Sequence, residues 1–145
     1  MSNTLNFSVN SISESPARTK INTRGFQLTV DEPKHLGGTD EAPNPVEYIL
    51  AGYAGCINVV AHIVAKELNV KLKNLEINIE GDLNPNRLLG KSFEDRAGYK
   101  NLSVSLKTDT NFDAGTKVKW LKEIEVRCPV NDNLSNKTPI QFSIN

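Results

Sequence analysis

The fold of this chain is decided by one long apolar stretch, residues 44–68, with the sequence NPVEYILAGYAGCINVVAHIVAKEL. Asn44 suits a helix N-cap, Pro45 suits the first helical position, and Glu47 stands where a capping box places its acidic residue. The sequence therefore predicts a helix over residues 45–68. Its apolar side chains are spread around most of the helix circumference, which is typical of a helix that is buried on several sides.

Small side chains interrupt the middle of this helix, just before Cys56: Ala51, Gly52, Ala54 and Gly55. They would let another backbone approach the helix closely. A membrane-spanning helix needs about 20 predominantly apolar residues. Because the stretch also contains Asn58 and His62, whose insertion into lipid is costly, it favours a buried helix of a soluble protein over a membrane span.

Alternating apolar residues predict strands on both sides of the helix. The expected strands and the second helix are residues 5–12, 17–22 and 24–30 before the helix, then strands 72–83 and 99–108, a helix over 113–127, and a closing strand 138–144. A turn around residues 22–23 would join the second and third strands. Four side chains of the second helix are expected to face inward: Val118, Leu121, Ile124 and Val126.

The expected order is therefore βββ-α-ββ-α-β. Strands that cluster, rather than alternate strictly with helices, favour an α+β fold with mainly antiparallel pairing. The chain of 145 residues has the length of one ordinary domain, and we expect residues 1–145 to form a single domain.

Charge excludes several classes of function. Lys and Arg number 17, and so do Asp and Glu, which leaves a net charge of zero and no clustered basic face for nucleic acid or for a membrane surface. Residues 1–5 have neither a basic start nor an apolar run, so we expect no secretory signal and a cytoplasmic location. Metal-ligand spacings such as CxxC or HExxH are not found, and no metal is predicted.

The two cysteines, Cys56 and Cys128, are too few for a disulfide scaffold. Two helices packed on one core would bring them together, so that a sulfenic acid on one sulfur could condense with the other to a disulfide. The alternative is that each is a small buried hydrophobe. A reactive Cys56 needs a nearby cation, for which Arg18 and Arg24 are the candidates. Arg127 is adjacent to Cys128 in sequence. For each arginine the sequence alone favours a solvated surface charge.

Several separated motifs in this order are similar to the OsmC/Ohr family. Residues 44–56, NPVEYILAGYAGC, resemble the helix that carries the reactive cysteine of that family. The further matching motifs are VDEP at 30–33, GGTD at 37–40, EGDL at 80–83, RCPV at 127–130 and TPI at 138–140. The resemblance covers the chain from about residue 17 to the end.

This resemblance implies an intertwined α+β homodimer with long central helices, flanking antiparallel sheets and active sites at the subunit interface. It implies a thiol peroxidase that prefers organic hydroperoxides, with Cys56 as the peroxidatic cysteine and Cys128 as the resolving one. Arg24 or Arg18 would be the arginine that activates the thiolate. No cofactor is implied, and the reductant would be an external dithiol such as a lipoyl group on a protein.

One departure from the family concerns the catalytic glutamate. Hydroperoxide-resistance members place it ten residues before the cysteine, where this chain has Val46, and Glu47 follows one residue later. One residue rotates a side chain by about 100° around a helix, so the family's Arg–Glu pair is absent or rebuilt here. Glu47 lies on the opposite side of the helix from Cys56, and its capping role needs no catalysis.

An apolar pocket around Ile49, Tyr53 and Ile57 would favour organic peroxides over hydrogen peroxide. Two further functions fit the same residues. One is a non-enzymatic dimer that binds a small apolar ligand at its interface, with structural cysteines. The other is a two-cysteine redox sensor that changes conformation on oxidation and turns over slowly.

Overall fold

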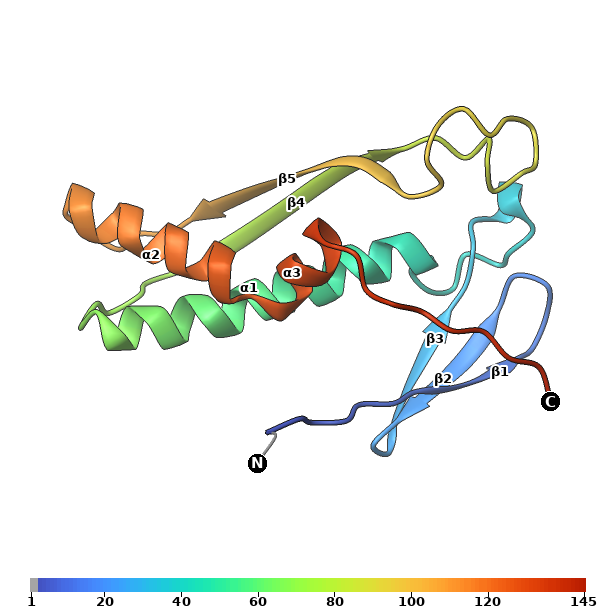
Figure 1. The fold of residues 1–145 in the computed structure, drawn as a ribbon, viewed down its shortest axis with the longest axis horizontal. Coiled ribbons are helices and arrows are strands. Elements are labelled where there is room, and N and C mark those ends of the chain that lie inside the picture. Colours follow the sequence, from blue (N-terminus) through green and yellow to red (C-terminus); the bar gives the residue numbers. More distant parts are fainter. Residues whose placement is uncertain (1–2) are drawn as a thin grey trace. The chain divides into compact units, whose positions relative to one another are not determined.

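The structure, a computed structural model, describes residues 3–145 and divides after Ile49 into an N-terminal and a C-terminal unit. Figure 1 labels the elements of both. Every strand pairing is antiparallel, and three helices accompany the strands, as expected for an α+β fold.

The N-terminal unit is built on one sheet with the strand order β1-β2-β3. Its strands are β1 (Asn10–Ser13), β2 (Thr19–Thr23) and β3 (Phe26–Val30), and a short 3-10 helix, η1 (Lys34–Leu36), follows. The first strand starts later than predicted. The hairpin turn lies at Arg24 and Gly25 rather than at residues 22–23, and both have positive φ, 47° and 86°. Two such residues match the twist of a two-residue hairpin turn.

The loop after β3 is organised by Asp31, whose side chain is fully buried. Its carboxylate accepts hydrogen bonds from the backbone N–H groups of Glu32, Thr39 and Glu41 and from the Thr39 hydroxyl. Gly38 packs against the same turn so closely that an added Cβ would lie 1.8 Å from the carbonyl oxygen of Glu32. The predicted loop is therefore a tightly fixed turn.

Helix α1 (Pro45–Glu67) begins as the sequence predicts. The backbone N–H of Glu47 donates to the side-chain oxygen of Asn44 at 2.9 Å, and the Glu47 carboxylate accepts from the Asn44 N–H at 2.8 Å. These reciprocal bonds are a capping box. By length and composition alone α1 could also cross a membrane, a property that core helices of soluble proteins share.

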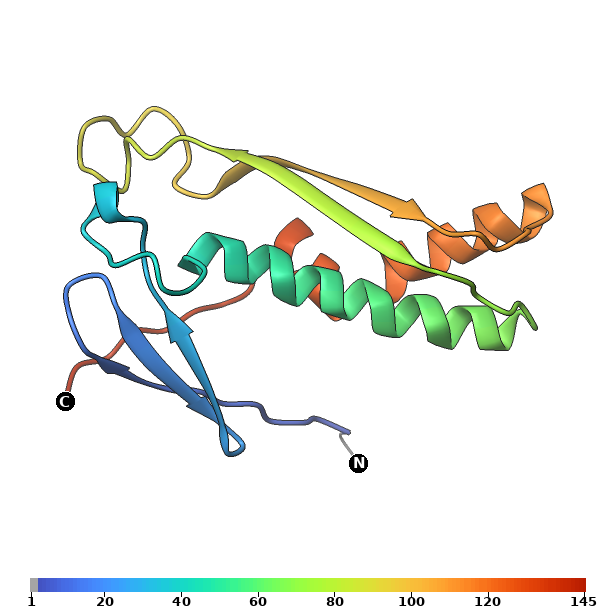
Figure 2. The same ribbon diagram turned by 180° about the vertical axis from the view of Figure 1, so that it is seen from behind.

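The C-terminal unit combines most of α1 with a hairpin and two further helices. The elements are β4 (Glu76–Leu83), β5 (Tyr99–Lys107), α2 (Ala114–Arg127) and α3 (Pro129–Ser135). Figures 1 and 2 show the β4–β5 hairpin running along α1 and α2. Alternate residues of β4, Ile77 and Ile79, face the helices and pack against their core, while the residues between them are exposed.

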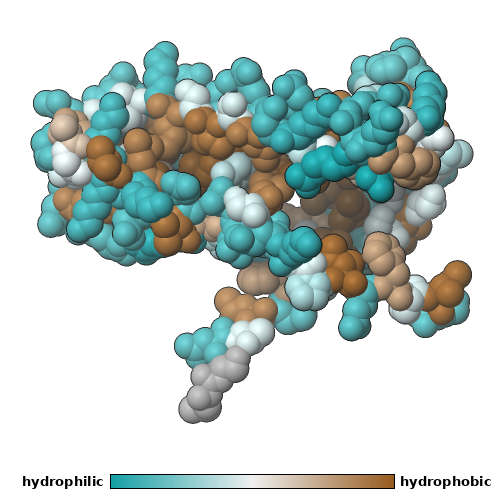
Figure 3. Space-filling model, turned by 45° about the horizontal axis from the view of Figure 1, so that its top comes forward, coloured by the Kyte–Doolittle hydropathy of each residue, from teal (hydrophilic) through white to brown (hydrophobic). Residues whose placement is uncertain are grey.

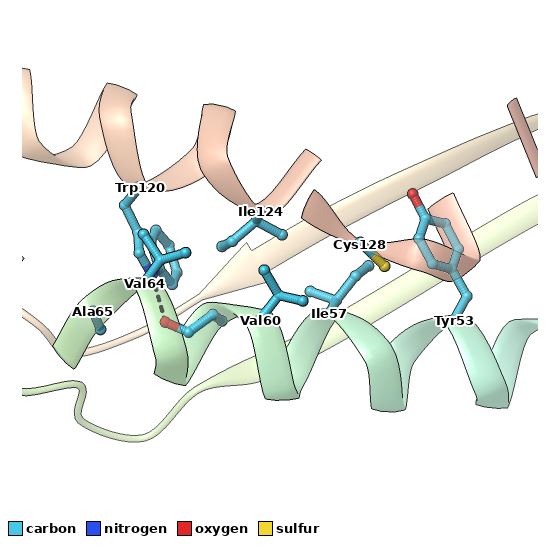
Figure 4. Packing of buried hydrophobic residues seen from close by; sticks show 9 residues of the cluster. Tyr53, Ile57, Val60, Val64, Ala65, Trp120, Ile124 and Cys128 are labelled. Atoms are coloured by element: carbon cyan, nitrogen blue, oxygen red, sulfur yellow. Dashed lines mark hydrogen bonds between the residues drawn. The ribbon is translucent and has the colours of Figure 1, made fainter. Parts of the chain in front are cut away.

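The core of this unit lies between α1 and α2 (Figure 4). Trp120 of α2 is 2% exposed, and its indole N–H donates to the Ala61 carbonyl of α1 at 2.9 Å. Phe112 packs on the indole ring, with centroids 4.9 Å apart. Burial of the Trp120 side chain stabilises the unit, because it removes a large apolar area from water.

Three sequence expectations for this unit are wrong. Residues 138–144 form no strand, and Ile140 is 73% exposed, because the sheets β1-β2-β3 and β4-β5 are formed without this segment. Helix α3 follows Cys128 directly and was not predicted. Of the four side chains expected to face inward from α2, only Ile124 is buried, while Val118 and Val126 are 68% and 64% exposed.

Helix α1 is likewise buried along only part of its circumference. Its buried side is Tyr53, Ile57, Val60, Ala61, Val64 and Ala65. Val59 and Ile63 on another side are 56% and 44% exposed, and a Cβ added at Gly52 or Gly55 would meet no atom within 4 Å. The close backbone approach expected at these glycines is therefore not made within the described part of the chain.

Candidate active site

The two cysteines meet inside the C-terminal unit. Cys56 lies on α1, and Cys128 is the residue at which α2 ends and α3 begins. Their sulfur atoms are 2.8 Å apart, and both residues are free cysteines. A disulfide bond of about 2.05 Å therefore needs only a small movement of the two side chains.

Cys128 is the more deeply buried of the pair, with 1% of its surface exposed. Burial raises the pKa of the Cys128 thiol, because a thiolate there would lose most of its hydration. The thiol donates to the sulfur of Cys56. Cys56, which is partly exposed, is thus the acceptor sulfur and the better placed of the two to attack an electrophile.

Asn131 holds the backbone around Cys128. Its backbone N–H donates to the Cys128 sulfur at 3.4 Å, the capping bond of α3. Its side-chain amide accepts from the Tyr53 hydroxyl at 2.5 Å and donates to the Glu125 carbonyl at 2.9 Å. Burial raises the pKa of Tyr53, which keeps the phenol a donor. In Figure 4 Tyr53 rises from α1 toward α3.

A cavity of about 840 Å³ opens beside the buried cysteine. Tyr53, Ile57 and Cys128 are among its lining residues, together with apolar side chains of β5 and α2 such as Leu106 and Trp120. Figure 3 shows apolar side chains gathered on the side where Figure 1 places α2 and β5. Two residues of the predicted apolar pocket line this cavity; the third, Ile49, belongs to the N-terminal unit.

A smaller pocket of about 450 Å³ opens beside Cys56. Apart from Cys56 its walls are apolar or small, except for Arg127. The Arg127 guanidinium pairs with both carboxylate oxygens of Glu67, at 2.6 and 3.0 Å, and with Glu123 at 3.5 Å. These partners raise the pKa of Arg127, and the same contact lowers the pKa of Glu67. The cation at the Cys56 pocket is therefore already paired.

The other predicted site residues lie in the N-terminal unit and make local contacts there. Arg18 forms ion pairs with Glu14 and Glu41, which raise the pKa of its guanidinium. Arg24 lies in the hairpin turn with its guanidinium 5.3 Å from the Phe26 ring centroid. Glu47 is occupied by the capping box. Among residues 3–145 no group of three His, Cys, Asp or Glu side chains is arranged to hold a metal.

Sequence reasoning missed Asn131. A signal for it was present: Pro129 suits the first position of a new helix, which makes Cys128 its N-cap and Asn131 the third helical residue that donates to a cap. Cysteine is also outside the usual set of N-cap residues, Ser, Thr, Asp and Asn, so the pattern is easily overlooked.

Comparison with known proteins assigns the class of protein. The chain is a two-cysteine α+β protein, and residues 38–143 match the sequence profile of the OsmC-like proteins. The chain therefore belongs to the OsmC-like protein family. No curated protein matches it in sequence.

Solved structures share the fold at low sequence identity. An OsmC-like protein from Mycoplasma pneumoniae has a TM-score of 0.78 and 18% identity, over 90% of this chain and 88% of that chain. An organic hydroperoxide resistance protein OsmC from Legionella pneumophila has a TM-score of 0.62 and 22% identity, over 90% and 89%. An organic hydroperoxide resistance protein from Elizabethkingia anophelis has 0.65 and 18%, over 91% and 89%.

Proposed function

We propose that this protein is a thiol-dependent peroxidase that reduces organic hydroperoxides in defence against oxidative stress. The observation that carries the proposal is the 2.8 Å separation of the Cys56 and Cys128 sulfurs, of which Cys128 is the buried one whose pKa is raised. Membership of the OsmC-like family supports it, as do fold neighbours described as organic hydroperoxide resistance proteins.

In the proposed reaction the Cys56 thiolate attacks the terminal oxygen of the peroxide. The O–O bond breaks, an alcohol leaves with a proton, and Cys56 becomes a sulfenic acid. Cys128 then condenses with it to a disulfide and releases water. An external dithiol, for which a lipoyl group on a protein is our candidate, reduces the disulfide and completes the cycle without a further cofactor. Such a cycle suits a reducing cytoplasm.

The activating cation is proposed to be Arg24 or Arg18, following the resemblance to the family. Their local contacts differ: Arg18 is held by two carboxylates, whereas the Arg24 guanidinium lies over the Phe26 ring. Glu47 is bound in its capping box, which supports a role for it in the helix start rather than in an Arg–Glu pair. Comparing Arg24→Lys with Arg18→Lys in the peroxide half-reaction decides between the two arginines.

We further propose that the protein is a homodimer. The support is the open stripe of α1 that contains Gly52, Gly55, Val59 and Ile63, which leaves apolar surface uncovered beside Cys56. Uncovered apolar surface of this kind marks interaction sites. Sedimentation of the wild type should give a dimer mass, and Val59→Glu on this stripe should shift it toward monomer. His62→Glu, which adds the same charge at an exposed residue of the same helix, is the matched control.

Stopped-flow consumption of cumene hydroperoxide in the presence of dithiothreitol tests the peroxidase proposal. Cys56→Ser should abolish turnover, and His62→Gln on the same helix should not change it. Without dithiothreitol, Cys128→Ser should consume about one equivalent of peroxide and accumulate a sulfenic acid that dimedone traps. Turnover that survives in Cys56→Ser would overturn the proposal.

A second function, binding of an apolar ligand, is favoured by the 840 Å³ cavity, since ligand sites are of this size. It predicts no sulfenic acid at Cys56 under mild oxidant, so the dimedone experiment separates it from the peroxidase. The two-cysteine redox sensor predicts disulfide formation but slow turnover and a large conformational change on oxidation.

A further inference from the structure

Tyr53 and Asn131 connect the two parts of the chain that carry the sulfurs. Tyr53 lies on α1 three residues before Cys56, which places both side chains on neighbouring positions of one helix surface. Asn131 lies in α3, three residues after Cys128. The hydrogen bond from the Tyr53 hydroxyl to the Asn131 amide, at 2.5 Å, therefore joins the helix of one cysteine to the turn of the other.

The remaining bonds of Asn131 fix the turn itself. Its side-chain N–H donates to the carbonyl oxygen of Glu125 in the last turn of α2, and its backbone N–H donates to the Cys128 sulfur. Three bonds to α1, α2 and Cys128 thus converge on one residue. Tyr53 is only 8% exposed, so its hydroxyl has little access to water as an alternative partner. Breaking the bond would leave a buried polar group unsatisfied.

We propose that Tyr53 and Asn131 are positioning residues for the resolving step, a clamp that holds the Cys128 sulfur in line with Cys56. This inference rests on the proposed peroxidase function. In the step, the Cys128 sulfur attacks the Cys56 sulfur of the sulfenic acid. The new S–S bond forms as the S–O bond breaks. The leaving hydroxide takes the Cys128 thiol proton and departs as water. The sulfenic sulfur is reduced while the Cys128 sulfur is oxidised.

Two physical reasons make the clamp matter at this step. Displacement at sulfur needs the attacking atom in line with the bond that breaks, and a misplacement of about 1 Å can slow an oriented reaction by roughly a hundredfold. Moreover, the Asn131 backbone N–H already points at the Cys128 sulfur and can stabilise the negative charge that develops as the thiol proton leaves. Both contacts are made to the turn that carries Cys128, so the clamp should act on resolution more than on the first oxidation. Tyr53 also lines the 840 Å³ cavity, and Phe at this position keeps the ring that faces it.

The test separates the two half-reactions in Tyr53→Phe, Asn131→Ala and the double variant. Tyr53→Phe removes one oxygen atom and is the variant least able to disturb folding. After one equivalent of cumene hydroperoxide, dimedone labelling reports sulfenic acid formation, and rapid alkylation of remaining thiols reports disulfide closure. We expect disulfide closure to slow by about tenfold, as the loss of one buried hydrogen bond implies, and to slow more than sulfenic acid formation does. The double variant should be no slower than Asn131→Ala, because both act through one contact.

Matched controls carry the same chemical deletions at other hydrogen bonds. Tyr48→Phe removes a hydroxyl that donates to the Thr29 carbonyl at 2.6 Å, and Asn133→Ala removes an amide of α3 that donates to the Pro129 carbonyl at 3.0 Å. Both should close the disulfide at the wild-type rate. Closure at the wild-type rate in Tyr53→Phe and Asn131→Ala would overturn the clamp. Equal slowing in the controls, or equal slowing of both half-reactions, would overturn it as well.

A second measurement does not depend on peroxide chemistry. In a buffer of reduced and oxidised dithiothreitol, the disulfide equilibrium of the Cys56–Cys128 pair gives the effective concentration of one sulfur at the other. We expect it to fall by about tenfold in Tyr53→Phe, a shift of about 30 mV to less negative potential for a two-electron couple. If the wild type forms no sulfenic acid, the peroxidase proposal fails, while this equilibrium still decides the clamp. An unchanged equilibrium overturns the clamp alone.

Discussion

Asp31 in the N-terminal unit and Cys128 in the C-terminal unit are the two most deeply buried titratable side chains described, with 0% and 1% exposed, yet the fold shifts their pKa values in opposite directions. Hydrogen bonds to Asp31, of which the Thr39 hydroxyl makes the largest contribution, lower its pKa well below the ordinary value. Burial raises the pKa of Cys128, against weaker help from the Asn131 N–H. Hydrogen bonds to the charged form thus outweigh desolvation in the pKa shift of Asp31, whereas desolvation prevails in that of Cys128.

The difference also separates a structural site from a reactive one. Four donors leave Asp31 charged and fix one loop conformation, so the carboxylate has no remaining capacity for chemistry. Cys128 keeps its proton and shares it with another sulfur, an arrangement that oxidation can change. Substitutions at both sites test this contrast.

The largest effect is expected for Asp31→Asn. The amide has one acceptor oxygen in place of two and turns N–H groups toward donors of the loop, so Tm should fall by on the order of 10 °C. Thermal unfolding followed by circular dichroism measures this. Asp40→Asn, an exposed residue of the same loop, is the control and should stay within about 2 °C of wild type. A similar Tm in both variants would remove the distinction between the two sites.

A smaller loss is expected for Gly38→Ala, which tests how tightly the Asp31 turn is packed. The new Cβ would lie 1.8 Å from the Glu32 carbonyl oxygen, and backbone cannot move aside as a flexible side chain can. Overpacking of this kind costs about 1–3 kcal/mol, and urea unfolding should show it. Gly115→Ala, whose nearest neighbour would be 3.5 Å away, should show no loss. A Gly38→Ala protein as stable as wild type would contradict the tight turn.

The pH dependence of Tm should separate the two groups: Asp31 should account for a fall in Tm at acid pH (the acid limb), and Cys128 for a fall at alkaline pH (the alkaline limb). The pKa of Asp31 is lowered by folding, so its contribution is complete above the unfolded value of about 3.9 and is lost as the pH falls below it. The pKa of Cys128 is raised, so its contribution is complete below the unfolded value of about 8.5 and is lost as the pH rises above it.

Variants identify the source of each limb. Asp31→Asn should flatten the acid limb and leave the alkaline one, whereas Cys128→Ser should do the reverse. Each limb should amount to several degrees. If Cys128→Ser leaves the alkaline limb unchanged, another group accounts for it and the contrast between the two sites loses its support.

The smallest effect is expected for Arg127→Met. Its ion pairs with Glu67 and Glu123 lie at the surface, where such contacts contribute about 0–1 kcal/mol. Met keeps much of the apolar stem, so Tm should change by less than about 2 °C, and 1 M salt should reduce the difference further. A loss as large as that of Asp31→Asn would show that exposed pairing, and not burial with donors, governs stability here.

Local sequence signals predicted the start of α1 well, because a capping box involves residues only three positions apart. Helix packing on one core indicated that Cys56 and Cys128 could meet, and the resemblance to the family indicated the role of each. Alternation of apolar residues predicted a strand at residues 138–144. Alternation specifies only an extended chain, however, and a strand also needs another strand to pair with. For the same reason periodicity placed Val118 and Val126 inward, although what they face depends on the whole fold.

The role of Asp31 could not be predicted from sequence. Its donors come from a turn that folds back over eight to ten residues, and nothing in the spacing distinguishes it from Glu32 or Asp40, which are ordinary loop charges by sequence. The role of Asn131 was easier to predict in part, because its position relative to Cys128 is local. Its contact with Tyr53, however, spans 78 positions of the chain. Long-range polar contacts follow from packing, which no local pattern encodes.

The separation of the two cysteines along the chain, 72 positions, has a consequence for the heat resistance of the protein. A disulfide that closes a loop of this length restricts the unfolded chain, and the loop-entropy estimate for that restriction is about 4 kcal/mol. Oxidised protein would then melt well above reduced protein. By thermodynamic reciprocity, the folded chain would protect its own disulfide by the same free energy, so a reductant would act most readily on molecules that had locally opened.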